Sequence, residues 1–283
     1  MSSVKGDRPA AGGPVRTLKI VVEYEGTAFS GFQRQRDLRT VQLVLEEALS
    51  KIFGHLARVA GAGRTDAGVH ALGQVVSTRC EGSIPTERIA EACNSVLPPD
   101  VAVRSVQEVA DDFHARKSAT GKSYRYVFST GSHRSPFLAR YAFHVKGVLD
   151  VQAMGRAAGH FRGTHDFRAY RATGSSVRTS KRTVFDTGVF EASVFETGVL
   201  ASLGERPERE PPERTVVFRV TADGFLYNMV RIMAGTLLLA GTGRMSPDDV
   251  PAIIESGDRE RAGRTLPAHG LWLWEVGYQV RFP

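Results

Sequence analysis

Residues 61–73, with the sequence GAGRTDAGVHALG, contain the residue types in this chain that are best suited to chemistry. Glycines on both sides enclose Arg64, Thr65 and Asp66. Glycine lets the backbone adopt positive φ angles and come close to a ligand, so the pattern favours a loop that presents Asp66 as a site carboxylate. A β-turn, in which glycine and aspartate are common, is the alternative. A phosphate-binding loop does not fit, because the Gly-Lys-Ser/Thr ending is missing and a carboxylate would repel phosphate.

Arg231 and three histidines are further polar side chains to be considered for a site. Arg231 lies in the apolar stretch MVRIMAGTLLLA, where an unpaired charge is costly to bury, so we expect it to pair with a carboxylate. A surface arginine that extends its charge into solvent is the alternative. His70, His160 and His165 have no second metal ligand at a recognisable spacing, so they are predicted to be structural histidines.

The composition is that of a globular protein with a basic charge balance, which favours an anionic partner but is also found in proteins that do not bind nucleic acid. The chain has 283 residues, of which 42% are hydrophobic and 24% charged, and this length suits two domains. Its net charge of +7 favours a polyanion, because each neutralised phosphate releases a counterion. Cys80 and Cys93 provide neither a disulfide framework nor a metal-binding spacing, which predicts a cytoplasmic protein without metal or cofactor. No apolar run is long enough to span a membrane, and residues 1–15 are predicted to be a disordered tail.

Hydrophobic periodicity predicts the same order of elements, β-α-β-β-α-β, twice. In the first half, strands are expected at 17–24, 56–60, 74–78 and 101–109, and helices at 41–53, capped by Thr40, and at 86–97. In the second half, strands are expected at 123–129, 183–195, 215–221 and 271–280, and helices at 151–161, 226–240 and, after a cap signature at 246–249, up to 255. Residues 204–214 are predicted to be a solvated loop.

The predicted fold class is therefore α+β, with two similar split β-α-β halves of the ferredoxin or RNA-recognition type at 16–112 and 113–283. We expect a largely antiparallel central sheet with helices on one side and a catalytic cleft between the halves. Tyr126 and Phe128 alternate along one predicted strand, and Met229 and Met233 lie four apart on a predicted helix, so all four are assigned to the core.

Several spaced motifs, in order along the chain, resemble those of one family. They are YEGT at 24–27, GFQ at 31–33, TVQ at 40–42, GRTDAGVH at 63–70, NSVLPPD at 94–100, FHAR at 113–116, KSYRY at 122–126, HDF at 165–167, DGFLYNMVR at 223–231 and GLWL at 270–273. On these motifs the chain resembles the tRNA pseudouridine synthase A family, also called pseudouridine synthase I. Phe32 stands where that family usually has tryptophan, and the connection at 191–214 is longer than typical.

The resemblance implies isomerisation of uridine to pseudouridine in the anticodon stem-loop of transfer RNA, at positions 38, 39 and 40, with Asp66 as nucleophile. The reaction breaks the N1–C1′ bond and joins C5 to C1′, and a single carboxylate can serve it by covalent attack. Glycoside hydrolases, in contrast, need a second carboxyl group. Whether Asp66 attacks C6 or C1′ is left open by the sequence.

The resemblance also assigns roles to other residues. It places Arg64 in the space left by the extruded base, pairs Arg231 with Asp66, and stacks Tyr124 on the target uracil, where its hydroxyl can assist proton transfer. Leu271 corresponds to the family's pocket leucine. Two neighbours of Asp66 in the same motif are predicted to contact the substrate, Thr65 and Gly68.

Basic residues near Tyr124 are predicted to follow the RNA backbone, with solvated surface charges as the alternative. They are Arg116, Lys117, Lys122, Arg125, Arg178, Lys181 and Arg182. A homodimer is expected from the family. Three other functions remain open: an RNA-binding module without catalysis, a nucleoside or glycoside hydrolase, and a pseudouridine synthase that acts on another RNA or on a free nucleotide.

Overall fold

The structure of the chain is a computed structural model, which describes residues 13–174, 179–192 and 214–278. The first strand begins at Val15, so it includes the last residue of the predicted tail, and residues 1–12 lie outside the described part. The predicted loop at 204–214 also lies outside it, apart from its last residue. No helix in the described ranges is both long and apolar enough to cross a membrane.

The first half has the predicted order of elements. It consists of β1 (Val15–Tyr24), α1 (Val41–Phe53), β2 (Ala60–Gly61), β3 (His70–Glu81), α2 (Thr86–Asn94) and β4 (Val101–Val109). The Thr40 hydroxyl caps α1 by accepting a hydrogen bond from the backbone N–H of Leu43, as predicted, and Gly54 ends the helix at a positive φ of 74°.

The predicted strand at 56–60 is wrong, because only Ala60 and Gly61 pair with β3. Side chains of α1 occupy the backbone N–H groups that a longer ladder would use. Ser50 Oγ accepts from the N–H of Ala57, and Glu46 Oε1 accepts from the N–H of Val59. The segment is therefore held by the helix instead of by the sheet.

The second half consists of β5 (Gly121–Gly131), β6 (Phe143–Lys146), α3 (Val151–Gly159), β7 (Gly163–Asp166), β8 (Lys181–Ala192), β9 (Thr215–Ala222), α4 (Met229–Gly241), α5 (Val250–Ser256) and β10 (Leu271–Gly277). Short 3₁₀ turns lie at Arg168–Tyr170, Pro247–Asp249, Arg259–Arg261 and Ala268–Gly270. The predicted cap before α5 is a full capping box between Ser246 and Asp249. The short strands β6 and β7 were not predicted, and α4 begins three residues later than expected.

The ten strands form one sheet with the order β4-β1-β3-β10-β5-β9-β8-β7, to which β2 and β6 add at β3 and β5. The two halves have equivalent strand orders, β4-β1-β3-β2 and β10-β5-β9-β8, which is the arrangement of a split β-α-β unit. Within each of these two sets, neighbouring strands are antiparallel. The halves meet where β10 pairs in parallel with the start of β3, through Trp272 opposite His70 and Leu273 opposite Ala71.

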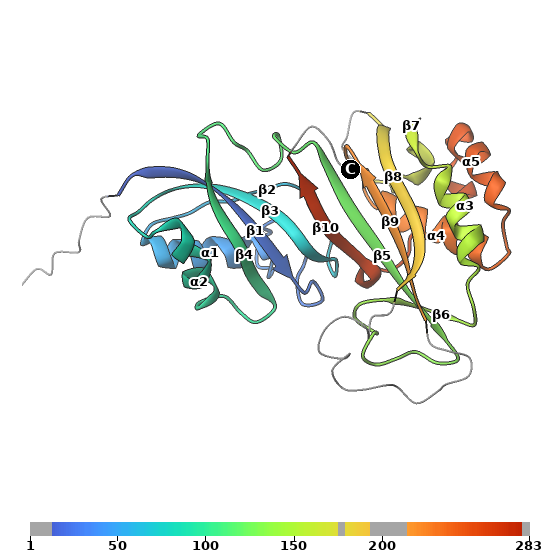
Figure 1. The fold of residues 1–283 in the computed structure, drawn as a ribbon, viewed down its shortest axis with the longest axis horizontal. Coiled ribbons are helices and arrows are strands. Elements are labelled where there is room, and N and C mark those ends of the chain that lie inside the picture. Colours follow the sequence, from blue (N-terminus) through green and yellow to red (C-terminus); the bar gives the residue numbers. More distant parts are fainter. Residues whose placement is uncertain (1–12, 175–178, 193–213, 279–283) are drawn as a thin grey trace, which may run out of the picture.

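Helices cover one face of this sheet, with α1 and α2 beside the first half and α3, α4 and α5 beside the second (Figure 1). Strand residues that point toward the helices are fully buried, as Ile20, Tyr126 and Phe218 illustrate. The predicted core positions Phe128 and Met233 are also fully buried, which confirms both assignments. The apolar contacts form one continuous core that extends through both halves, so the two halves hold each other in place.

Candidate active site

The loop between β2 and β3 presents Asp66 on a tight turn. The backbone N–H of Val69 donates to the carbonyl of Asp66 at 3.2 Å, and Gly68 has a φ of 79°, the value that a type II turn needs at its third residue. The segment therefore forms the β-turn that was the alternative interpretation, and the first residue of this turn is the carboxylate Asp66 that was proposed for the site. Gly68, predicted to contact the substrate, does not line the cleft, and a Cβ at this position would approach Ala268.

A buried polar network fixes this loop against the sheet. The hydroxyls of Tyr24 and Thr65 lie 2.7 Å apart, and the Gln74 amide donates to the Gly63 carbonyl at 2.9 Å. The Thr65 carbonyl also accepts from the backbone N–H of Phe32 at 3.0 Å. Burial raises the pKa of Tyr24 to about 12, so its phenol stays protonated and acts as a fixed partner. Tyr24 and Gln74 were not predicted as site residues, because each also fits a strand position; the motif at 24–27 was the available signal.

Asp66 lies beside Arg231, the partner that the family resemblance implied for this arginine. Nη1 of Arg231 lies 3.6 Å from Oδ2 of Asp66, and the side chains are 17% and 35% exposed. Burial raises the pKa of Asp66, and the charge of Arg231 lowers it. The guanidinium is itself fixed, since Nε donates to the Leu266 carbonyl at 2.6 Å and Nη1 donates to Oδ1 of Asn228 at 2.7 Å. The carboxylate thus faces a cation that cannot easily turn away.

The second half supplies an apolar wall opposite the loop. Tyr124 is almost fully buried and packs edge-on against Phe225, with ring centroids 5.0 Å apart. Leu271, the first residue of β10, is buried beside it. A Cβ at Gly63 would lie 3.8 Å from the Tyr124 hydroxyl oxygen, so the loop and the phenol are close. Burial, followed by the charges of Tyr24 and Asp66, raises the pKa of Tyr124 and keeps it neutral.

These elements enclose a cleft of about 790 Å³ between the halves. That volume is in the range of pockets for small ligands and suits one extruded nucleotide. The first half contributes Phe32, Gln33, Gln42, residues 59–66 and Val69, and the second contributes Tyr124, residues 225–230 and Leu271. Phe225, Tyr227 and Asn228 were not predicted as lining residues, although the motif at 223–231 contains them.

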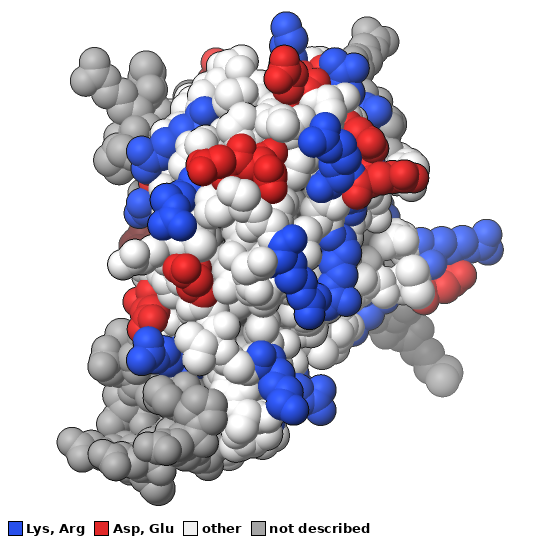
Figure 2. Space-filling model, turned by 90° about the vertical axis from the view of Figure 1, so that its right-hand side faces the viewer, with Lys and Arg blue, Asp and Glu red and all other residues white. Residues whose placement is uncertain are grey.

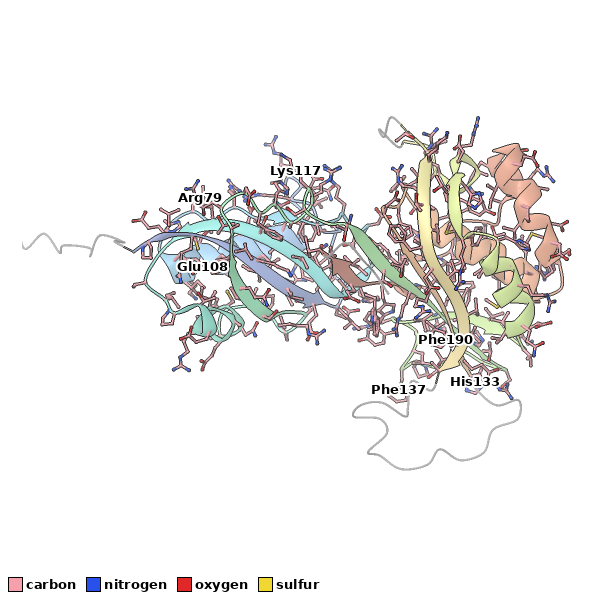
Figure 3. All side chains as sticks on the ribbon, turned by 45° about the horizontal axis from the view of Figure 1, so that its top comes forward. Arg79, Glu108, Lys117, His133, Phe137 and Phe190 are labelled. Carbon is pink, nitrogen blue, oxygen red and sulfur yellow. The ribbon has the colours of Figure 1, made fainter. Side chains whose placement is uncertain are left out.

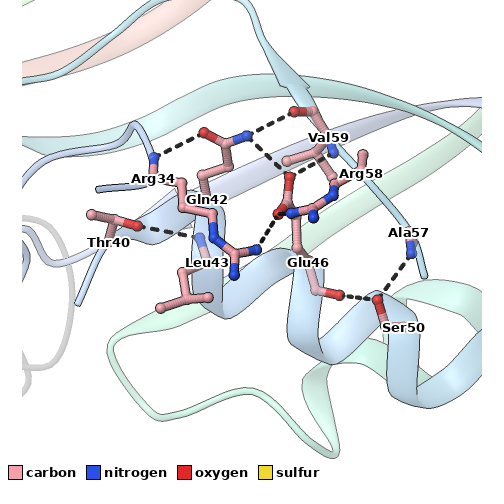
Figure 4. Close-up of polar contacts among 9 residues, drawn as sticks. All are labelled: Arg34, Thr40, Gln42, Leu43, Glu46, Ser50, Ala57, Arg58 and Val59. Carbon is pink, nitrogen blue, oxygen red and sulfur yellow. Dashed lines mark hydrogen bonds and ion pairs between the residues drawn. The ribbon is translucent and has the colours of Figure 1, made fainter. Parts of the chain in front are cut away.

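A buried carboxylate outside the cleft holds its first-half wall (Figure 4). Glu46 is 2% exposed, and its Oε2 accepts from Arg34 at 3.1 Å and from Arg58 at 2.8 Å. Its Oε1 accepts from the Gln42 amide and from the N–H of Val59, both of which belong to cleft-lining residues. Burial raises the pKa of Glu46, but the hydrogen bonds outweigh it and the net shift is downward. Sequence reasoning missed this cluster, because Glu46 fits an ordinary helix position.

Only some of the basic residues predicted to follow the RNA backbone line the cleft. Arg116 and Lys122 line the cleft, and a Cβ at Gly63 would lie 3.2 Å from Cε of Lys122. Burial lowers the pKa of Lys122 and the charge of Arg116 lowers it further, while Asp223 opposes this shift and Arg182 adds to it, so Lys122 lies near two cations and one carboxylate. Lys117 is exposed on the connection between the halves (Figure 3), and Lys181 is exposed at the start of β8.

Arg125 lies away from the cleft, because it alternates with Tyr124 along β5 and points to the opposite face of the sheet. Its guanidinium stacks 3.3 Å from the centroid of the Trp274 ring. Arg178 lies outside the described residues. Arg64 is exposed at the cleft and makes no ion pair within the described ranges, which leaves its charge available to a ligand.

The end face of the second half carries charged side chains of both signs. Figure 2 shows basic and acidic side chains interspersed there. Arg162 and Arg219 both pair with Asp186, and Arg168 pairs with Asp166. Arg64 and Arg116 line the cleft and have no ion pair among the described residues, so they are the better match to a polyanion.

The three histidines have structural contacts. His70 is fully buried, accepts from the backbone N–H of Gly26 through Nδ1, and lies within hydrogen-bond distance of the Arg140 carbonyl through Nε2. Its ring stacks on Trp272, and burial lowers its pKa. His160 contacts Asp248, and His165 contacts the Arg162 carbonyl. Within the described ranges, no group of three or more His, Cys, Asp or Glu side chains is arranged to hold a metal ion.

Fold and site together define a class of protein: an α+β enzyme with two similar halves and a basic cleft between them, in which Asp66 is the one carboxylate among the described lining residues. Comparison with known proteins gives the family. A family model described as tRNA pseudouridine synthase matches residues 20–116 and 157–279, and the chain belongs to that family.

Individual relatives match over nearly the whole chain. The protein is 44% identical over 264 residues to tRNA pseudouridine synthase A of Acetivibrio thermocellus, covering 93% of this chain and 100% of the relative. It is 43% identical over 263 residues to the enzyme of the same name from Bacillus subtilis, covering 92% and 98% of the two chains. A chain in a crystal structure of a Cbf5-Nop10-Gar1 complex aligns with 78% of this chain and 53% of its own length, at a TM-score of 0.31 and 15% identity.

Proposed function

We propose that this protein isomerises uridine to pseudouridine in transfer RNA, with Asp66 as the nucleophile. One observation distinguishes an isomerase from a hydrolase, the two kinds of enzyme that break a glycosidic bond. Asp66 is the one acidic side chain among the described residues that line the cleft. A glycoside hydrolase needs two carboxyl groups, and the described lining residues supply only one. An isomerase that keeps its uracil in the cleft can work with a single carboxylate.

The geometry supports a division of roles. Arg231 favours the ionised form of Asp66, which then attacks the nucleoside at C6 or C1′. The N1–C1′ bond breaks, the uracil turns within the cleft, and C5 bonds to C1′. The bond to Asp66 is then broken, which restores the carboxylate, the C5 proton is lost to a base or to solvent, and N1 gains a proton. Tyr124 and Leu271 exclude water from the detached base, and the Tyr124 ring provides a stacking surface. Because burial disfavours the phenolate, the Tyr124 hydroxyl serves as a neutral hydrogen-bonding group that can assist proton transfer at C5.

The RNA is proposed to lie along the basic side of the cleft. Arg116, Lys122 and Arg182 contact the phosphates nearest the target uridine, with Lys117, Arg178 and Lys181 extending the track. Arg64 fills the space of the extruded base. The target uridines lie at positions 38, 39 and 40 of the anticodon stem-loop, the protein acts in the cytoplasm as a homodimer, and its chemistry uses neither metal nor cofactor. Arg125, on the opposite face, is not part of this track.

A tritium-release assay tests the proposal. Transfer RNA transcript labelled at uridine C5 is incubated with wild-type protein, with Asp66→Asn, and with Asp37→Asn as a control at an exposed aspartate of the same half. We expect release by wild type and by the control, and none by Asp66→Asn. Absence of release by wild type would overturn the isomerase, free uracil would indicate a hydrolase, and equal release from labelled uridine monophosphate would indicate a free-nucleotide substrate.

A further inference from the structure

Asn228 has an unusual backbone conformation at the edge of the cleft. Its φ of 60° and ψ of 8° place it in the left-handed region, which among the described non-glycine residues only Asp37 shares. Asparagine tolerates this region better than most residues, but it is still less favourable than the ordinary helical region. Asn228 occupies the N-cap of α4, yet its side chain makes no capping hydrogen bond. The usual reason for asparagine at a helix start is therefore missing here.

The amide of Asn228 is directed to Arg231 instead. Oδ1 of Asn228 accepts a hydrogen bond of 2.7 Å from Nη1 of Arg231, the same nitrogen that lies 3.6 Å from Oδ2 of Asp66. The second fixed point of the guanidinium is the bond from Nε to the Leu266 carbonyl. With both bonds in place, a long side chain with many rotamers is held in one orientation.

The left-handed turn makes this contact possible. The backbone N–H of Ile232 donates to the Asn228 carbonyl, so α4 begins immediately after Asn228, with Arg231 in its first turn. A normal N-cap would direct the Asn228 side chain to backbone N–H groups of that turn. In this structure the backbone N–H groups of the first turn of α4 receive no hydrogen bond from the Asn228 side chain, and the amide oxygen of Asn228 accepts from Arg231 instead. Local strain of this kind is most often retained where it serves a site.

We propose that Asn228 is a positioning residue, which fixes the Arg231 guanidinium against the nucleophile Asp66. This inference rests on the proposed role of Asp66. Asn228 acts through Arg231, so its removal should impair the chemical step and leave RNA binding intact. A role limited to backbone conformation would be satisfied by glycine, which adopts the left-handed region freely.

The test is Asn228→Gly, which keeps the positive φ and removes the acceptor. Asp37→Gly is the matched control, because it makes the same backbone change at the other positive-φ position, where the side chain pairs only with exposed Arg36 among its described neighbours. We expect Asn228→Gly to lower the single-turnover rate of tritium release about ten-fold, the size expected for loss of a hydrogen bond to a charged group. The Kd for transfer RNA should stay within two-fold, and the acidic limb of the pH–rate profile should move to higher pH.

A double-mutant cycle with Arg231→Lys separates this role from direct contact with substrate. Lysine keeps a charge but lacks the guanidinium that Asn228 holds, so Asn228→Gly should have little further effect in the Arg231→Lys background. Full additivity of the two changes, a weaker Kd as the main effect, or an unmoved acidic limb would each overturn the proposal. An inactive wild type would instead overturn the proposed function, so the two failures are distinguishable.

Discussion

Replacement of Arg231 by glutamine should make the reaction strongly dependent on pH. Two unit charges about 4 Å apart interact by about 4 kcal/mol at an effective dielectric constant of about 20. Asp66 is 35% exposed, so solvent screening reduces the expected interaction to roughly 1–2 kcal/mol. That energy corresponds to a change of roughly ten-fold in the balance between the carboxylate and the carboxylic acid of Asp66.

The sign of the effect follows from the two influences on Asp66. Burial raises its pKa, and Arg231 opposes this increase. Without Arg231 the carboxyl group remains protonated to higher pH, and the protonated form cannot act as a nucleophile. In Arg231→Gln, kcat/KM relative to wild type should therefore fall further as the pH is lowered, and the extra loss should approach about ten-fold once the pH lies below the pKa of Asp66 in both proteins.

The assay is tritium release from labelled transfer RNA across pH 5.5–9, at constant ionic strength because RNA binding depends on salt. Arg156→Gln is the control, since Arg156 is an exposed arginine on α3 with no described ion pair. A loss of equal size at every pH would refute the reasoning, because it would show that Arg231 does not act through the ionisation of Asp66.

Three further predictions concern the walls of the cleft. Glu46→Ala should lower the free energy of unfolding in urea by about 2 kcal/mol, because the buried N–H of Val59 loses its acceptor, and an unchanged midpoint would contradict this. Tyr124→Phe should slow tritium release about 100-fold with little change in RNA affinity; a normal rate would show that the hydroxyl has no role. The double change of Arg116 and Lys122 to alanine should reduce the slope of log K against log salt by about 2 in filter binding, and an unchanged slope would remove both from the phosphate track.

Local sequence patterns predicted the two split β-α-β units, because each depends on short-range periodicity and turn residues. The pairing of β10 with β3 could not be predicted in this way, since it joins residues about 200 positions apart and only two residue pairs define it. The strand expected at 56–60 failed for a similar reason. Its apolar pattern suits a strand, but Ser50 and Glu46 of α1 bind its backbone.

The site was predicted only in part. Asp66 and Arg231 could be proposed as site residues, because a charged residue among glycines or in an apolar helix is conspicuous and because the family motifs contain both. Tyr24 and Gln74 could not, since a strand residue that supports a loop has the same local pattern as any other strand residue. Asn228 could not be predicted either, because the apolar residues around it predicted an uninterrupted helix from 226. Its left-handed backbone conformation is seen only in the structure.

The seam between β3 and β10 has a consequence for biosynthesis. The ribosome releases the Asp66 loop and its partner strands long before it releases residues 271–277, which place Leu271 in the cleft and Trp272 on His70. In a nascent chain, Asp66 therefore faces an incomplete pocket until β10 has been released. Because a contact between distant parts of the chain is slow to form, closing the seam is expected to be a late step of folding. The cleft therefore stays without its Leu271 wall until residues 271–277 have been released and have paired with β3.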